Sequence, residues 1–356
     1  MKQRIKRVLA KRPHRKKRAP ESTLEQAIRG IPRITNETVA EHREAVLSSA
    51  RKYIYPLKHS AHRVVVVSAS LIIVVIVAFF SFCMLELYKF HSTSTFMYRV
   101  TQVIPFPVAK AGSSYVSYEN YLFELRHYIH YYQTQQKVDF SSESGKQQLT
   151  DYSKRALDTV IGGAYAKQLA KQNKISVSTQ EVNDQITTIR AQNRLGDNQK
   201  VFADVLKEFW GWSIDDFRRE LSQQILNQKV VTKLDTQTNQ RAQDVLAQLQ
   251  NGADFGQLAA KYSDDKSTAA NNGDYGIDIT QTTREIPPAV VAQLFKMQAG
   301  QTSGIINAGS SLEILRVKDN NGTVVHASHI GFEFKNIDAF TAPLEAKSKP
   351  HKFISL

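Results

Sequence analysis

The sequence predicts an α+β protein with a single N-terminal transmembrane helix, a mainly helical domain and a small domain built on an antiparallel sheet. Three patterns lead to this fold class. An uncharged run of 22 residues covers Val64–Leu85. Apolar residues then recur at spacings of three and four across residues 115–169, as in amphipathic helices. Near the C-terminus, two strand-like segments, 311–317 and 323–334, flank the turn signal KDNNG.

The uncharged run is long enough to cross a bilayer as a helix. At a rise of about 1.5 Å per residue it reaches roughly 33 Å, against a hydrocarbon core of about 30 Å. Arg63 and Glu86 bound it sharply. Its many β-branched residues do not indicate a buried strand, because no strand has this length. We therefore place the transmembrane helix at residues 63–87.

Charge predicts the orientation of this helix. Residues 1–63 hold 17 Lys and Arg against 5 Asp and Glu, whereas the rest of the chain holds 30 against 28. The positive-inside tendency therefore keeps the N-terminus cytoplasmic and exports the C-terminal domains. A cleaved signal peptide fits poorly, because 63 residues precede the run and no small-residue cleavage pattern follows it. The predicted location is the cell membrane, with a single pass and extracytoplasmic C-terminal domains.

The basic tail before the helix explains most of the net charge of +14, which would otherwise suggest nucleic-acid binding. Its basic cluster at 11–18 contains no aromatic residue, so nucleic acid is not the expected partner. We expect a partly disordered cytoplasmic tail with an amphipathic helix at 36–55 that lies along the membrane. Three roles stay open: fixing topology, contacting anionic lipid, or contacting RNA or the ribosome.

Cys83, the only cysteine, lies inside the membrane run, so the exported half has no disulfide and must bury its own core. Two domains of modest size would do so. The segments that we predict are a tail at 1–62, the membrane helix at 63–87, a linker at 88–112, a helical domain at 113–235, a sheet-containing domain at 236–335 and a flexible tail at 336–356.

Local signals mark where helices begin. Ser178 and Glu181 form a capping-box pattern, and Ser213 opens a similar one. In the sheet-containing domain, Gly252 is suited to end one helix and Asp254 to cap the next.

Longer segments carry a resemblance to known families. Three segments resemble, in their order along the chain, the N-terminal chaperone domain of SurA and PrsA-type foldases. They are VSYENYLFELR (116–126), RALDTVIGGAYAKQLAKQNKISVSTQEV (155–182) and WSIDDFRRELSQQILNQKVV (212–231). Four later segments look like a parvulin-type, PpiC-like peptidyl-prolyl isomerase domain. They are 241–265, NGDYG (272–276), 286–306 and SLEILRV (311–317). Together the resemblance covers most of the exported half.

The parvulin resemblance implies a set of site residues. Asp265 matches the family's cysteine or aspartate, and Ser263 lies nearby. The proline pocket, normally one methionine and two phenylalanines, becomes Ile286, Val290 and Phe295. The family also has two histidines on adjacent central strands. Glu313 replaces the second, and residues 229–240, where the first should lie, contain none.

The segment HASHI (326–330) resembles the strand that opens the parvulin domain. In this chain it follows the last strand, 311–317, instead of preceding the first helix at 241. We therefore expect a permuted domain whose first strand, 323–334, comes from the C-terminal side and supplies His329. A three-residue loop at 320–322 would place Glu313 directly opposite His329, whereas a two-residue Asn321-Gly322 turn would put them on opposite faces. We favour the three-residue loop, which predicts a Glu–His pair.

The resemblance implies an extracytoplasmic folding factor with isomerase and chaperone activity on unfolded or exported polypeptides. Rotation about an X–Pro bond needs no metal, nucleophile or cofactor, and we predict none. The altered pocket and Glu313 also fit a holdase or scaffold that binds peptides without catalysis. A tail that tethers ribosomes or nucleic acid to the membrane is the third, weaker hypothesis.

Overall fold

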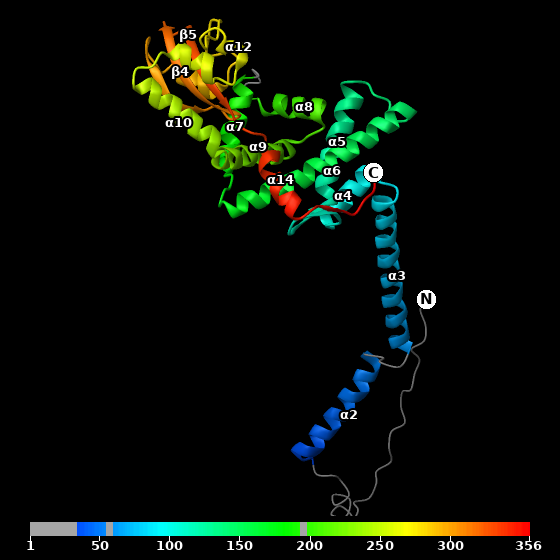
Figure 1. Ribbon diagram of the computed structural model, residues 1–356. Coiled ribbons are helices and arrows are strands. Elements are labelled where there is room, and N and C mark those ends of the chain that lie inside the picture. The colour runs from blue at the N-terminus through cyan, green and yellow to red at the C-terminus, as the bar shows by residue number, and fades with distance from the viewer. Residues whose placement is uncertain (1–33, 55–59, 193–197) are drawn as a thin grey trace, which may run out of the picture. The chain divides into compact units, whose positions relative to one another are not determined.

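The computed structural model describes residues 34–54, 60–192 and 198–356. It divides into two compact units, with the boundary after Ser81. The predicted basic cluster at 11–18 lies outside the described residues. The N-terminal unit contains α2 (Asn36–Ile54) and most of α3 (Ser60–Tyr88) (Figure 1). The helix expected at 36–55 is thus present as α2, with Val39, Val46 and Leu47 exposed.

The uncharged run forms the greater part of α3. Among the described residues, the stretch Arg63–Tyr88 is the one helix long and apolar enough to span a membrane, with 26 residues and a mean hydropathy of 3.0. Its apolar side chains between Val64 and Val77 are largely exposed. An apolar helix surface of this size calls for an apolar surrounding.

The second unit begins with a mainly helical part. Its elements are α4 (Thr95–Val103), β1 (Pro107–Ala111), β2 (Ser114–Ser117), α5 (Tyr118–Thr134), α6 (Glu143–Gln172), α7 (Thr179–Gln192), α8 (Gln199–Trp210) and α9 (Ile214–Leu234). The segment 88–112, predicted to be a linker, therefore contains α4 and β1. Apolar residues of both elements are buried, among them Met97 of α4 and Val108 of β1.

Both capping boxes start helices as predicted. Ser178 Oγ accepts a hydrogen bond from the Glu181 amide, and the Glu181 carboxylate accepts one from the Ser178 amide. Ser213 and Asp216 make the same reciprocal pair at the start of α9. These bonds satisfy amides that the first helical turn leaves without partners.

The sheet-containing part follows in the chain. It consists of α10 (Thr236–Gln250), α11 (Phe255–Tyr262), α12 (Lys266–Ala269), α13 (Pro288–Leu294), β3 (Thr302–Asn307), β4 (Ser311–Asn320) and β5 (Val325–Glu333). The strands form an antiparallel sheet in the order β3-β4-β5. Two isolated bridges, Asp274 with Ser328 and Ile279 with Val325, join a further segment to the outer edge of β5.

The sheet separates two apolar cores. On one face, Leu312 and Ile314 of β4 and Ile330 and Phe332 of β5 join the core that includes residues of α10 and α11. On the other face, a second core contains α13 and the apolar residues Leu315, Val317, Val325 and Ala327. Strand alternation places Glu313 and His329 on this second face, beyond the apolar residues.

The hairpin between β4 and β5 differs from the predicted one. Asn320 pairs with Val325, so the loop has four residues, Asn321–Val324, and both predicted loop lengths are wrong. The Asn321 side chain fixes this loop by accepting hydrogen bonds from the Thr323 and Val324 amides. Gly322 has φ +85°, the left-handed conformation that was expected of it.

The last residues pack against the helical part, which corrects the prediction of a flexible tail at 336–356. Helix α14 (Ile337–Lys347) contacts α6 and α9, and β6 (His351–Lys352) pairs with β1 in a second sheet of order β2-β1-β6. Tyr165 donates a hydrogen bond to the Ser348 carbonyl, and Ile354 is buried. The chain thus leaves the helical part at α9 and returns to it at α14 (Figure 1).

Candidate active site

His329 of β5 is held between two carboxylates. Its Nδ1 lies 2.5 Å from Glu313 Oε2, and its Nε2 lies 3.0 Å from Asp265 Oδ2. Thr268 Oγ1 is also 2.8 Å from Nε2. The side chains of His329 and Glu313 are 6% and 8% exposed, against 34% for that of Asp265. Both ring nitrogens are therefore engaged, and only the Asp265 side of the network meets solvent.

The predicted Glu–His pair is present, although its predicted register is wrong. Glu313 pairs across the strands with Gly331, and His329 pairs with Leu315. The pairing is displaced by two residues, an even shift that keeps Glu313 and His329 on one face as diagonal neighbours. An irregularity between Val317 and Asp319 and the longer hairpin loop together produce this displacement.

Gly331 leaves the space through which Glu313 reaches His329. A Cβ at position 331 would lie 3.5 Å from Glu313 Oε1 and 3.7 Å from His329 Cε1, both ordinary contacts. A methyl group would therefore fit, whereas a branched side chain would press into the pair. Ser311 holds the other carboxylate oxygen by donating a hydrogen bond of 2.8 Å to Glu313 Oε1.

Asp265 both caps a helix and contacts the histidine. It is the N-cap of α12, and its Oδ1 accepts hydrogen bonds from the amide and hydroxyl of Ser267. Burial alone would raise its pKa. The hydrogen bonds from Ser267 and Thr268 and the nearby His329 outweigh this effect, so the pKa of Asp265 is lowered. The Asp265 carboxylate is thus ionised at neutral pH.

Tyr275 covers the imidazole from one side. Its ring stacks on that of His329, with centroids 4.2 Å apart and planes 15° from parallel. Burial, followed by the charges of Glu313 and Asp265, raises the pKa of the Tyr275 hydroxyl, which therefore stays neutral. Gly273 brings this loop against β5: its carbonyl accepts from the His329 amide, and a Cβ there would lie 2.3 Å from the His329 carbonyl oxygen.

Ser263 contacts the backbone of β5 beside the site. It is fully buried, and its Oγ accepts a hydrogen bond of 3.1 Å from the Gly331 amide. The neighbouring Asp264 accepts a bidentate pair of bonds from Arg241 of α10. These contacts tie the loop that carries Asp265 to α10 and β5. Ser263 is therefore close to the network without lining the cleft above it.

A cleft of about 640 Å³ opens above the network. Asp265, Glu313 and His329 line it, together with Ile286 and Pro287, which precede α13. Of the three residues expected to form a proline pocket, only Ile286 lines the cleft. Val290 is fully buried in the core of the α13 face, and Phe295 packs against that core. Val290 of α13 and Phe295, directly after that helix, thus both face the sheet.

Three further residues complete the network and were not predicted from the sequence: Thr268, Tyr275 and Ser311. The signal for Tyr275 was the NGDYG segment, whose two glycines allow a close approach of the loop to a strand. Thr268 and Ser311 gave no such signal, because hydroxyl residues are common near helix starts and strand ends. Within the described residues, no group of His, Cys, Asp and Glu side chains is arranged to hold a metal ion.

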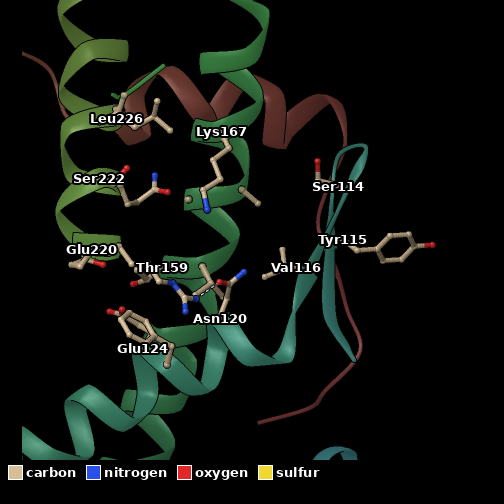
Figure 2. Close-up of a pocket in the computed structure, with 17 residues that line it drawn as sticks. Ser114, Tyr115, Val116, Asn120, Glu124, Thr159, Lys167, Glu220, Ser222 and Leu226 are labelled. Carbon is tan, nitrogen blue, oxygen red and sulfur yellow. Dashed lines mark hydrogen bonds between the residues drawn. The ribbon is translucent and has the colours of Figure 1, made fainter. Parts of the chain in front are cut away.

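A second cavity, of about 560 Å³, lies in the helical part between β2, α5, α6 and α9 (Figure 2). Val116 of β2 points into it from one side and Leu226 of α9 borders the other, whereas Tyr115 points away from it (Figure 2). Arg219 of α9 also lines it, paired with Glu119 by two hydrogen bonds and placed over the Phe123 ring, 4.2 Å from the ring centroid. The cavity is therefore amphipathic.

Comparison with known proteins places both parts of the chain. The family model described as SurA-like N-terminal domain matches residues 58–231, and the one described as PPIC-type PPIASE domain matches residues 225–319. The two matches together run from the start of α3 to the end of β4. Strand β5, which carries His329, lies outside both.

Individual relatives carry the same names. Chaperone SurA of Thiobacillus denitrificans is 37% identical over 97 residues, covering 25% of this chain and 21% of that protein. Chaperone SurA of Pectobacterium atrosepticum is 28% identical over 248 residues, covering 55% and 57%. The putative peptidyl-prolyl cis-trans isomerase YacD of Bacillus subtilis is 25% identical over 195 residues, covering 49% and 65%.

Each alignment spans less than two thirds of the relative, but the order of the matched domains agrees with the fold described above. A helical part, matched by the SurA-like model, precedes a small α+β part with an antiparallel sheet, matched by the PPIC-type model. The chain is therefore SurA/PrsA-like: a segment that matches the SurA-like N-terminal domain is followed by one that matches the PPIC-type peptidyl-prolyl isomerase domain.

Proposed function

We propose that this protein is a membrane-anchored, extracytoplasmic folding factor that accelerates cis-trans rotation of X–Pro bonds in exported polypeptides. The observation that carries this proposal is the position of His329, between Glu313 and Asp265 at the base of a cleft, in a PPIC-type isomerase domain. The barrier to rotation, about 18–20 kcal/mol, arises from amide resonance. A thousandfold acceleration needs only about 4 kcal/mol of stabilisation of the twisted amide.

The residues of the site divide this work. Ile286, 2% exposed at the cleft wall, and the exposed Ile277 offer an apolar surface against which a proline ring can pack. Asp265, at the solvent side, and His329 supply the polar groups nearest to a bound peptide, and Glu313 holds the imidazole in place. Val290 and Phe295 support the helix behind Ile286, and Ser263 supports β5. Bond rotation by these groups involves no covalent intermediate and calls for no cofactor or metal.

The proposal includes a permuted isomerase domain. Strand β5 would take the place of the strand that opens the domain in other family members, delivered from the C-terminal side by the hairpin after β4. Two observations support this arrangement. The family match ends at residue 319, before β5, and β5 lies between β4 and the segment bridged at Asp274 and Ile279.

The helical part would hold the client chain. Its amphipathic cavity, lined by Val116 and Leu226 as well as by Glu220 and Lys167, can receive apolar and charged side chains of an extended polypeptide (Figure 2). Helix α3 would anchor the protein, with the basic N-terminal tail in the cytoplasm and α2 along the inner leaflet. The excess of Lys and Arg before α3 supports this orientation.

Isomerisation of a proline tetrapeptide by the full-length chain in detergent micelles tests the catalytic proposal. We expect an acceleration that falls at least tenfold in His329→Ala and in Asp265→Ala, with circular dichroism reporting whether each variant is folded. Asp319→Asn, an exposed change on β4 outside the cleft, is the matched control. Equal rates for the wild type and a folded His329→Ala variant would contradict the assignment of the site.

One observation favours a second candidate, a holdase that binds peptides without isomerising them. Both nitrogens of His329 already have partners, and its side chain is only 6% exposed. A protein of this kind would suppress aggregation of an unfolded client and leave the tetrapeptide rate unchanged. Measuring both activities on one preparation separates the two candidates.

A further inference from the structure

The charged residues that line the isomerase cleft share one sign. Besides His329 they are four carboxylates, Asp265, Glu285, Glu313 and Glu333, and neither lysine nor arginine is among the lining residues. Residues 64–356 as a whole are nearly neutral, with 30 Lys and Arg against 28 Asp and Glu. A cleft lined by acidic groups alone in a nearly neutral part of the chain points to a selective site.

Two of these carboxylates are available to a ligand. Glu313 and Asp265 are engaged with His329, whereas Glu285 and Glu333 are exposed. In the described part of the chain, neither Glu285 nor Glu333 takes part in an ion pair. The one hydrogen bond to their carboxylates is from the Arg284 amide to Glu285.

The nearby cations of the chain do not neutralise the cleft. Arg241 is paired with Asp264, and Lys318 is paired with Asp274. Lys266 and Lys335 donate to neutral oxygens, the Ser263 carbonyl and Gln237 Oε1, and neither is among the residues that line the cleft. Arg284, beside Glu285 in sequence, is exposed and is not among the lining residues. A cation supplied by the ligand is therefore the natural partner of the two free carboxylates.

The two carboxylates flank the place where proline would bind. Glu285 immediately precedes Ile286, the apolar wall of the cleft, and Glu333 lies at the end of β5, beyond His329. A peptide whose proline packs on Ile286 would bring its neighbouring residues toward these groups. Lysine and arginine side chains are long enough to reach a carboxylate from an adjacent position, and arginine can bind it with two hydrogen bonds.

From this geometry we infer that the cleft selects X–Pro sequences in which a lysine or arginine adjoins the proline. The inference rests on the proposed function and names its substrate class. The acidic residues alone do not define the site, which the isomerase-domain match and the His329 network define independently. Because Glu285 and Glu333 are exposed, each pair would be weak, so the expected preference is about three- to tenfold.

Two-dimensional exchange NMR with the full-length chain in micelles tests the inference. The probes are peptides that differ only beside proline: Arg-Pro, Leu-Pro, Glu-Pro, and a fourth with Arg after the proline. We expect kcat/KM to be about three- to tenfold higher for an Arg-containing peptide than for Leu-Pro, and lowest for Glu-Pro. Raising the salt from about 20 mM to about 500 mM should shrink the difference, because exposed pairs are screened.

Variants assign the effect to residues. The double variant E285Q/E333Q keeps the side-chain shapes, so the Arg-to-Leu ratio should fall toward one, and Glu333→Lys should invert the preference. Asp319→Asn, outside the cleft, should leave the ratio unchanged. Equal rates on Arg-Pro and Glu-Pro, or a preference that survives in E285Q/E333Q, would overturn the inference.

Peptide binding, measured by chemical-shift titration of the same four peptides, separates this inference from the proposed function. If no peptide is isomerised but the Arg-containing peptides bind tightest, catalysis fails and the selectivity stands. If all peptides are isomerised or bound alike, the selectivity fails and the catalytic proposal stands.

Discussion

Glu313 Oε2 lies 2.5 Å from His329 Nδ1, although the two residues are diagonal neighbours and not direct partners across β4 and β5. The contact depends on Gly331, which occupies the position opposite Glu313 and has no side chain to fill it. A buried carboxylate and an imidazole at this distance fix each other's orientation. The Glu313 carboxylate on β4 therefore holds the His329 ring on β5 in one orientation.

The first prediction concerns the charge of Glu313. Glu313→Gln keeps the shape of the side chain and removes the ionic part of its bond to His329, which is worth about 1.5–3 kcal/mol for a charged partner. We expect kcat/KM on an X–Pro peptide to fall about tenfold to a hundredfold. The assay is isomerisation of a proline tetrapeptide, with a thermal melt to show that the variant folds. An unchanged rate in a folded protein would mean that Glu313 has no part in positioning the ring.

The second prediction uses the space at Gly331. Alanine there would make ordinary contacts with Glu313 and His329, so Gly331→Ala should keep the pair and most of the activity. Valine would place a second and third carbon between the carboxylate and the ring. Gly331→Val should therefore separate the pair, seen as a changed His329 side-chain NMR signal, and reduce the rate. Similar spectra for the two variants would argue against the steric role of Gly331.

Sequence reasoning located the strands of the site but not their register. The predicted common face of Glu313 and His329 is nevertheless correct, because strand alternation depends only on parity and the register error is even. The irregularity near Lys318 has no side-chain signature, and the loop length depends on hydrogen bonds that Asn321 makes after the turn has formed. These two effects combined into an even displacement, which preserved the Glu313–His329 contact.

The side-chain directions in the proline pocket and the burial of the C-terminal segment could not be predicted from the sequence, for a different reason. Val290 and Phe295 were assigned by position in a family pattern, but the direction of a side chain on the short helix α13 depends on how the helix docks against the sheet. Ile354 follows Phe353 in an apolar pair that is too short to show a period, so periodicity could not reveal its burial. Single anchoring residues outside a repeat carry no pattern from which to predict them.

The third prediction concerns Asp235, at the junction of α9 and α10. It is 2% exposed and accepts hydrogen bonds from the Thr238 amide and hydroxyl and from the Lys335 amide. It therefore joins the two places where the chain passes between the helical part and the sheet-containing part. Burial would raise its pKa, but the hydrogen bonds from Lys335 and Thr238 outweigh burial and lower it.

A lowered pKa in the folded state means that the ionised group stabilises the fold above the unfolded value of about 3.9. This contribution is lost as the pH falls through the folded pKa. We expect Asp235→Asn to lower the free energy of unfolding by about 1–3 kcal/mol near neutral pH and by much less below about pH 3. Urea unfolding at both pH values measures this. A difference from wild type that did not depend on pH would show that shape, not charge, matters at this position.

The fourth prediction tests whether the C-terminal segment is part of the fold. Ile354 is 6% exposed, next to β6 in the sheet of the helical part, while Ser355 beside it is exposed. Removing a buried isoleucine side chain typically costs about 2–5 kcal/mol, because apolar contacts are lost and a cavity remains. Ile354→Ala should therefore lower the melting temperature by several degrees, and the matched change Ser355→Ala should leave it almost unchanged. If the two variants melt together, residues 348–356 do not stabilise the helical part.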